Sequence, residues 1–197
     1  MRKSNIFLII AILIFIAYYY IKIVKKTDDR SKKETIERVS SYDRKEWGKW
    51  IDADNDGLNT RQEVLFEESL INPKVENNKV VSGRWYDKFS GEYFNDPKDL
   101  DVDHFVPLKN AYESGGSNWS KKKKEEYYNY LKSENHLIAV SKRMNRSKGD
   151  KGPTKWLPPN EEYQCEYVRT WYRIKTDWGL TLEEGFDDVS NRVCRGK

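Results

Sequence analysis

The stretch Asp101–Pro107 reads Asp-Val-Asp-His-Phe-Val-Pro and holds one of the two histidines in this chain of 197 residues. Apolar residues bracket the polar ones, so the pattern predicts a short strand that runs into a turn. A carboxylate is a hard oxygen ligand for a divalent ion, and an imidazole accepts a proton from water because its pKa is near neutrality. Asp103 and His104 together therefore suit metal-assisted hydrolysis, although an Asp-His pair by itself is more often structural.

The segment Leu137–Pro153 supplies the second half of the pattern. It opens with four apolar residues that predict another short strand, and Ser141 is a suitable N-cap for a brief helix carrying Asn145. Strand, strand and helix together predict a ββα unit. Such a unit would bring Asn145 and Asp103 to one divalent ion and place the polar atoms of His104 close to them, while Asp101 has a supporting place at the start of the first strand.

The rest of the folded part predicts an α+β domain in which helices wrap this unit. Residues 80–86 and 91–94 alternate around a turn and predict a β-hairpin. Seven Trp and thirteen Tyr give enough apolar bulk for a core despite a mean hydropathy of −0.93. This aromatic content excludes a disordered chain. Tyr167, Trp171 and Ile174 recur at helical spacing and predict a core-facing helix.

The N-terminus has a separate character. Ile6–Ile21 is an apolar and aromatic run that follows Arg2 and Lys3, and as a helix it would rise about 24 Å, slightly less than a hydrocarbon core of about 30 Å. We expect a membrane anchor or uncleaved signal over residues 1–24, because no small-residue cleavage site follows, and its orientation stays open. A charged linker over residues 25–41 and the folded domain over residues 42–197 complete the expected organisation.

Net charge and cysteine usage bear on partners and compartment. The net charge of +4 suits a polyanionic partner without establishing one. Cys165 and Cys194 lack zinc-site spacing, so they form either one disulfide, as in an extracytoplasmic domain, or two buried thiols. Combined with the apolar N-terminus, the cysteines favour a domain outside the cytoplasm, membrane-anchored or secreted.

The segment from residue 52 to residue 63 matches the pattern of a calcium-binding loop at its defined positions. Carboxylates at alternate positions converge on one ion, and the glycine at the sixth position permits the sharp turn. A single structural Ca²⁺ site and a solvated acidic turn both remain open. The expected ligands are Asp52, Asp54, Asp56, Leu58 through its carbonyl, and Glu63.

Four short motifs occur in order along the chain: Asp-Val-Asp-His-Phe-Val-Pro-Leu at 101–108, Leu-Ile-Ala-Val-Ser at 137–141, Asn-Arg-Ser-Lys-Gly-Asp at 145–150 and Trp-Leu-Pro-Pro-Asn at 156–160. In combination they resemble the HNH endonuclease superfamily. More narrowly, the chain is similar to small secreted HNH proteins related to the C-terminal domain of GmrSD-type modification-dependent restriction enzymes. The resemblance covers roughly residues 42–180.

The resemblance implies a ββα-metal (His-Me finger) nuclease. His104 would be the general base that activates water, and Asp103 and Asn145 would ligate one divalent ion. Asn145 stands where the strict motif has its final histidine, which favours Mg²⁺ over a transition metal. Asn135 falls near the middle asparagine of the family, which orients the base.

Other polar residues have weaker claims. The resemblance makes Arg146 and Lys148 candidate phosphate contacts. Arg61 and Arg84 suit either phosphate contacts or ordinary surface roles, and His136, the other imidazole, suits a structural role.

We therefore expect a metal-dependent endonuclease that cleaves DNA, with RNA as an alternative substrate, and with little sequence specificity. Mg²⁺ is the expected cofactor, together with one structural Ca²⁺ if the acidic loop is occupied. Nucleic acid and the membrane are the expected partners, and no obligate protein partner is evident. The rival function is a non-enzymatic, membrane-tethered domain that binds calcium or nucleic acid.

Overall fold

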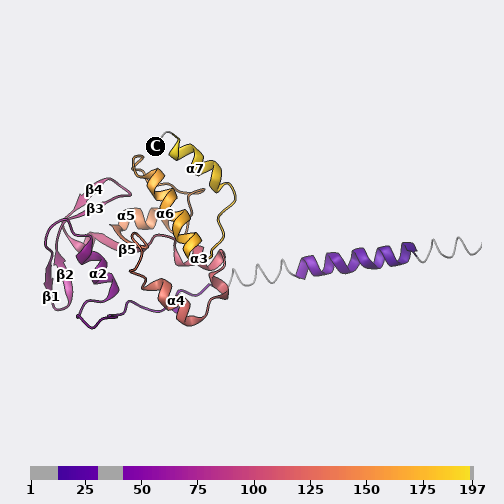
Figure 1. Cartoon of the computed structure of the whole chain (residues 1–197), viewed down its shortest axis with the longest axis horizontal. Coiled ribbons are helices and arrows are strands. Elements are labelled where there is room, and N and C mark those ends of the chain that lie inside the picture. The colour runs from indigo at the N-terminus through magenta and orange to yellow at the C-terminus, as the bar shows by residue number, and fades with distance from the viewer. Residues whose placement is uncertain (1–12, 31–41, 196–197) are drawn as a thin grey trace, which may run out of the picture. The chain divides into compact units, whose positions relative to one another are not determined.

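A computed structural model of the chain describes residues 13–30 and 42–195 (Figure 1). The chain divides into two compact units, Met1–Tyr42 and Asp43–Lys197. In the first unit residues 13–30 form a helix, and no helix within the described residues is long and apolar enough to span a bilayer. Charged residues occupy the second half of this helix, and residues 1–12 of the predicted anchor lie outside the described part, so the anchor is not confirmed. The predicted linker begins inside the helix, and its residues 31–41 also lie outside the described part.

The second unit contains the strand-strand-helix arrangement that the sequence predicts. Strands β5 (Leu100–His104) and β6 (Leu137–Ser141) pair antiparallel, with Asp103 opposite Ile138. Helix α5 (Lys142–Lys148) follows β6 directly, and the side chain of Ser141 caps it by accepting a hydrogen bond from the backbone of Met144 at 3.3 Å. The mixed α+β fold is therefore confirmed.

One face of the β5–β6 pair carries a hydrophobic cluster of the core. Apolar side chains from alternate positions of both strands pack against helix α2 (Thr60–Glu67) and against Trp85, because successive residues of a strand point to opposite faces. The indole of Trp85 donates to the carbonyl of Leu65 at 2.8 Å, which satisfies its buried N–H. The buried members of this cluster are Val64, Leu65, Val80, Trp85, Leu100, Val102, Leu137 and Ala139.

Two small hairpins replace the single hairpin that the sequence predicts. Strand β1 (Lys74–Glu76) pairs with β2 (Lys79–Ser82), and β3 (Trp85–Asp87) pairs with β4 (Glu92–Phe94). The expected first strand over residues 80–86 is divided at Gly83, where a Cβ atom would lie 2.5 Å from the ring of Trp85. The close approach of this ring requires glycine and ends β2, so that part of the prediction is wrong.

The remaining short elements surround the β5–β6 pair. They support an aromatic cluster in which the rings of Trp47, Trp119, Tyr127 and Trp178 contact one another. Helix α4 ends beside β5, and this position matters for His104. These elements are η1 (Arg44–Trp47), η2 (Pro97–Asp99), α3 (Leu108–Glu113), η3 (Gly116–Asn118) and α4 (Lys121–Tyr128).

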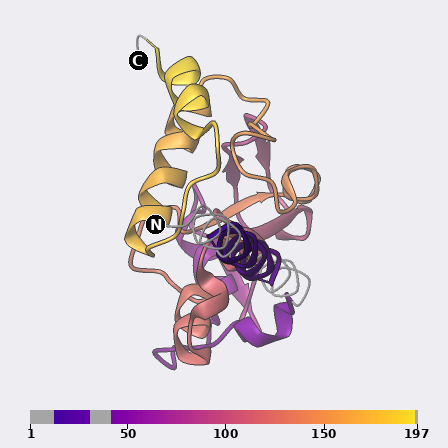
Figure 2. The same ribbon diagram turned by 90° about the vertical axis from the view of Figure 1, so that its right-hand side faces the viewer.

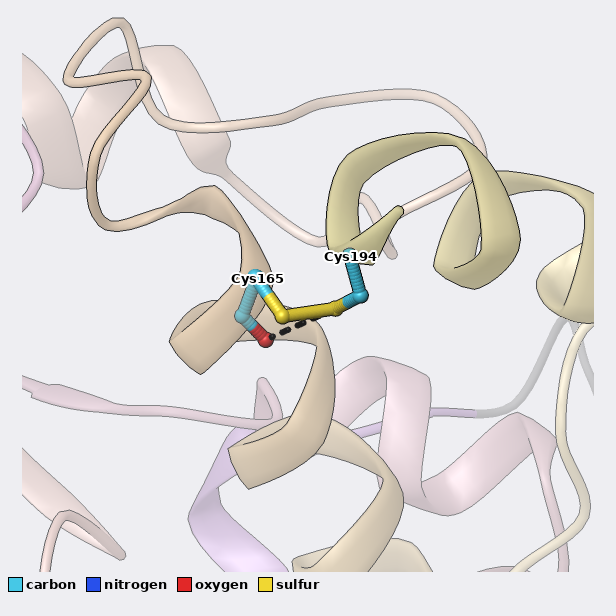
Figure 3. The surroundings of a disulfide bond; sticks show 2 residues. All are labelled: Cys165 and Cys194. Atoms are coloured by element: carbon cyan, nitrogen blue, oxygen red, sulfur yellow. Dashed lines mark hydrogen bonds between the residues drawn. A yellow bond between two sulfur atoms is a disulfide. The ribbon is translucent and has the colours of Figure 1, made fainter. Parts of the chain in front are cut away.

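Helices α6 (Gln164–Asp177) and α7 (Phe186–Cys194) close the unit and lie side by side in both views (Figures 1 and 2). The predicted core residues of α6 are buried, which confirms that helix. Cys165 in α6 and Cys194 in α7 form a disulfide (Figure 3). The pairing resolves the two open alternatives for the cysteines in favour of the disulfide.

Candidate active site

Two acidic side chains of β5 face helix α5. Asp101 and Asp103 are two positions apart on the strand, so they share a face. Oδ2 of Asp101 accepts a hydrogen bond from Nδ2 of Asn145 at 2.9 Å. Oδ2 of Asp103 lies 2.6 Å from Nζ of Lys148, one turn further along α5. The helix therefore presents one partner to each carboxylate.

The Asp103–Lys148 pair is enclosed. Lys148 is fully buried and Asp103 is 8% exposed, and Nζ of Lys148 also donates to the carbonyl of His104 at 3.1 Å. Burial is the main cause that raises the pKa of Asp103, and the charge of Lys148 opposes this shift. Burial is also the main cause that lowers the pKa of Lys148, and the charge of Asp103 opposes that shift. The 2.6 Å separation is that of a charge-assisted hydrogen bond, so we treat the pair as ionic.

His104 ends β5 and points to the opposite face from Asp103. Its ring is stacked on Trp50, with 5.3 Å between ring centroids and 7° between planes. Nε2 lies 2.9 Å from the carbonyl oxygen of Tyr128. A carbonyl only accepts hydrogen bonds, so Nε2 carries the proton of the neutral ring and Nδ1 carries the lone pair. Burial is the main cause that lowers the pKa of His104 below its usual value, which favours this neutral form.

The C-terminal end of α4 fixes both imidazoles of the chain. The last carbonyls of a helix lack partners within it, and here the carbonyls of Tyr127 and Tyr128 accept from His136 and His104. His136 is 1% exposed and is enclosed by the rings of Tyr127, Tyr130 and Trp178. These contacts suit the structural role predicted for His136.

Comparison with known proteins places this arrangement in a family. The family described as GmrSD restriction endonucleases, C-terminal domain, matches residues 59–182. The chain belongs to this family. It is also 35% identical over 142 residues to an uncharacterized secreted protein of Arthroderma benhamiae, an alignment that covers 72% of this chain and 68% of that protein. No solved structure matches the chain. The predicted resemblance to the GmrSD C-terminal domain is confirmed, and a nuclease that binds nucleic acid follows from it at the level of the family.

Within this GmrSD C-terminal domain, Asn135 lies in the turn before β6. Its backbone has a positive φ of 59°, a conformation that asparagine tolerates better than most residues. Its Oδ1 accepts a hydrogen bond from Nζ of Lys88 at 3.2 Å. The structure therefore places Asn135 against Lys88, whereas Asn145 contacts Asp101.

The predicted phosphate contacts differ in accessibility. Arg146 is exposed on α5, whereas Lys148 is buried in its pair with Asp103. Arg61 donates to the carbonyl of Leu100 at 3.3 Å. The guanidinium of Arg84 lies 4.7 Å from the centroid of the Tyr93 ring. Of these four side chains, Arg84 and Arg146 are exposed and open to a ligand without rearrangement of a buried contact.

The acidic loop ahead of α2 brings its carboxylates together. One ligand oxygen from each of Asp52, Asp54 and Asp56 lies within 4.8 Å of the others. The backbone N–H of Gly57 donates to Oδ2 of Asp52 at 3.0 Å. Oε2 of Glu63 is buried without a hydrogen-bond partner. Burial chiefly, and then the three aspartates, raise the pKa of Glu63, so its carboxyl group faces their negative charge.

Sequence reasoning missed the aromatic surroundings of His104. Trp50 and Tyr128 contact the imidazole ring from segments 54 residues before it and 24 residues after it. Neither residue belongs to the short motifs that point to the family. No local pattern signals these contacts, because they arise where η1 and α4 pack together.

Proposed function

We propose that the chain is a metal-dependent endonuclease of the HNH type, which hydrolyses phosphodiester bonds of DNA with little sequence specificity and accepts RNA as an alternative. The observation that carries the proposal is the β5–β6–α5 unit inside the matched family region. In this unit oxygen ligands line one face of β5, and an imidazole with its lone pair on Nδ1 ends the same strand.

The residues present suit one hard divalent ion. Asp103 and Asn145 would hold it, with Asp101 in support. Asp101 and Asp103 each accept a hydrogen bond from α5 through Oδ2, which leaves the second carboxylate oxygen for a ligand. Asn145 donates through Nδ2, which leaves its amide oxygen for a ligand. Mg²⁺ is usually held by one or two carboxylates, waters and substrate phosphates, which this all-oxygen set fits. When bound, the ion would supply positive charge against the phosphate oxygens.

His104 is proposed as the general base. Its Nδ1 would accept the proton of the attacking water, while the Tyr128 carbonyl holds Nε2–H and so fixes the tautomer. Asp103 and His104 point to opposite faces of β5, so the proposed substrate lies across the end of the strand, with the carboxylate on one side of it and the imidazole on the other. Stacking on Trp50 would keep the ring in this orientation.

The other predicted site residues have supporting roles in the proposal. Arg146, exposed on α5, would contact a substrate phosphate. Lys148 would hold Asp103 in place through the buried pair, since it is closed to a ligand in this conformation. Asn135 would orient the turn before β6 through Lys88.

The test is cleavage of supercoiled plasmid by the full chain in Mg²⁺. His104→Gln is expected to reduce turnover by about 10²–10⁴-fold, the usual contribution of a general base. The matched control is His136→Gln, which changes another buried imidazole on the adjacent carbonyl and should retain cleavage at temperatures where it is folded. Equal cleavage by parent and His104→Gln would end the assignment of His104. Absence of cleavage by the folded parent in Mg²⁺, Mn²⁺ and Ca²⁺ would leave the non-enzymatic alternative.

A second candidate function is structural calcium binding by the loop of Asp52, Asp54 and Asp56. The convergence of the three carboxylates and the unpartnered Oε2 of Glu63 favour it. We propose one Ca²⁺ there, with the carbonyl of Leu58 as a further ligand. The ion would offset the repulsion among these carboxylates and fix the start of α2.

We also propose that the nuclease domain works outside the cytoplasm. The disulfide between Cys165 and Cys194 suits an oxidising compartment. The similar protein from Arthroderma benhamiae is described as secreted.

A further inference from the structure

Arg44 lies beside the candidate active site although it precedes the family-matched residues. It opens η1, and its Nη2 donates to the hydroxyl of Tyr128 at 3.4 Å. Its Cζ lies 5.7 Å from the centroid of the same ring. Tyr128 thus holds the guanidinium by its edge and by its face, while Arg44 itself remains exposed.

Tyr128 also connects Arg44 to His104. The rings of Tyr128 and His104 have centroids 4.7 Å apart, and the Tyr128 carbonyl accepts from Nε2 of His104. Trp50 completes the group, with its ring centroid 4.5 Å from that of Tyr128. One tyrosine therefore contacts both the proposed base and an exposed cation.

Arg44 has no ion-pair partner within the part of the chain that the structure describes. Among the described residues no carboxylate forms an ion pair with it within 4.0 Å, whereas Lys124 on the facing helix is paired with Glu46 at 2.7 Å. The guanidinium of Arg44 is held on the Tyr128 ring, which in turn contacts the ring of His104. An exposed arginine next to a proposed phosphodiester site has the charge and geometry to bind a phosphate, because its N–H groups match phosphate oxygens in pairs.

We propose that Arg44 and Tyr128 form a phosphate-binding subsite that holds the nucleic-acid backbone next to the bond cleaved at His104. The proposal rests on the proposed nuclease function and extends it to residues ahead of position 59. The subsite contacts the backbone alone, so it would contribute affinity without base preference. That property agrees with little sequence specificity.

The test separates binding from cleavage. The full chain carrying His104→Gln is titrated with a fluorescent oligonucleotide duplex at several salt concentrations, with and without Arg44→Gln. Each phosphate contact adds about 0.9 to the slope of log K against log salt for duplex DNA. We expect Arg44→Gln to reduce that slope by about 1 and to weaken binding about tenfold near 0.15 M salt.

Lys45→Gln is the matched control, since it removes the same charge from the adjacent exposed position of η1. It should change the slope by less than half as much, because among the described residues no tyrosine ring holds Lys45 toward the site. Arg44→Lys should keep most of the slope, and Tyr128→Phe should lose part of it. Equal slopes for the two glutamine variants, or an unchanged slope for Arg44→Gln, would overturn the subsite.

The two proposals fail differently in this design. A parent chain that cleaves plasmid, combined with an Arg44→Gln variant of unchanged salt slope and KM, removes the subsite and leaves the nuclease. A parent chain that binds the duplex with an Arg44-dependent slope and does not cleave it retains the subsite and removes the enzyme. Thermal unfolding of each variant verifies that the compared proteins are folded.

Discussion

His104 and His136 donate from Nε2 to adjacent carbonyl oxygens at the end of α4, those of Tyr128 at 2.9 Å and Tyr127 at 2.8 Å. The same backbone element therefore fixes the tautomer of both imidazoles. The two rings differ at Nδ1. In His136 this atom is buried without a hydrogen-bond partner, whereas Nδ1 of His104 does not belong to the buried, unpartnered atoms of the described residues. The proposed base and a neutral core residue are therefore both oriented by one helix terminus.

The pH dependence of stability should report on His136. Burial is the main cause that lowers its pKa from 6.5 to about 4. Between these values the unfolded chain binds more protons than the folded one, so the free energy of unfolding falls as the pH drops through this window. The loss approaches about 3 kcal/mol at the lower end. Urea unfolding of the parent and of His136→Gln at pH 7.5, 6 and 5 measures it. The variant should lose this part of the dependence, and parallel pH profiles would contradict the assignment.

The buried pair of Asp103 and Lys148 should be strongly coupled. Lys148→Met leaves the Asp103 carboxylate buried without its partner, so we expect a loss of about 3–5 kcal/mol in the free energy of unfolding. Asp103→Asn together with Lys148→Met removes both charges and should recover part of that loss. A double-mutant cycle by urea unfolding at pH 7.5 gives the coupling energy.

Arg143→Met is the matched control for the Lys148 change. Arg143 is on the same helix and is paired with Glu92 at 3.1 Å, but both side chains are more than half exposed. Its removal should cost at most about 1 kcal/mol. Similar losses for the two helix positions would show that the buried pair has no special weight.

Local signals in the sequence were sufficient for the strand-strand-helix unit. The apolar runs, the N-cap at Ser141 and the helix end near Gly149 are short-range features, and each one is where the pattern predicts it. The period of two in β5 also determines that Asp103 and His104 point to opposite faces. The expectation that their polar atoms meet at one point ignored this alternation.

The partners within the site could not be predicted in the same way. Asn145 contacts Asp101, and Lys148 contacts Asp103, because the register of β5 and β6 sets which helix position faces which carboxylate. His104 meets Trp50 and Tyr128 through packing between distant segments. Such pairings depend on tertiary geometry, which residue patterns do not contain.

Calcium should stabilise the second unit through the acidic loop. If Ca²⁺ binds at Asp52, Asp54 and Asp56, saturation at about 100 times the dissociation constant adds about 2.7 kcal/mol to the free energy of unfolding. Thermal unfolding of the parent in Ca²⁺ and in chelator measures the shift. Asp54→Ala with Asp56→Ala should abolish the shift.

The matched control for the loop is Asp187→Ala with Asp188→Ala, which removes two exposed acids at the start of α7. This variant should keep the full calcium response, because the change in net charge is the same and the loop is intact. A parent whose unfolding temperature is the same in Ca²⁺ and in chelator would refute the site.

The disulfide should hold α7 against α6. Cys165 and Cys194 are 29 positions apart, and closing a loop of that length stabilises the folded state by about 3–4 kcal/mol in the chain-entropy account. Cys165→Ser with Cys194→Ser should therefore lower the free energy of unfolding by about that amount. Reductant should lower the unfolding temperature of the parent and leave that of the double variant unchanged. Because α7 follows the family-matched residues and the site is built from β5, β6 and α5, DNA binding should persist in the double variant at temperatures where it is folded. Loss of binding by this folded variant would show that α7 supports the site directly.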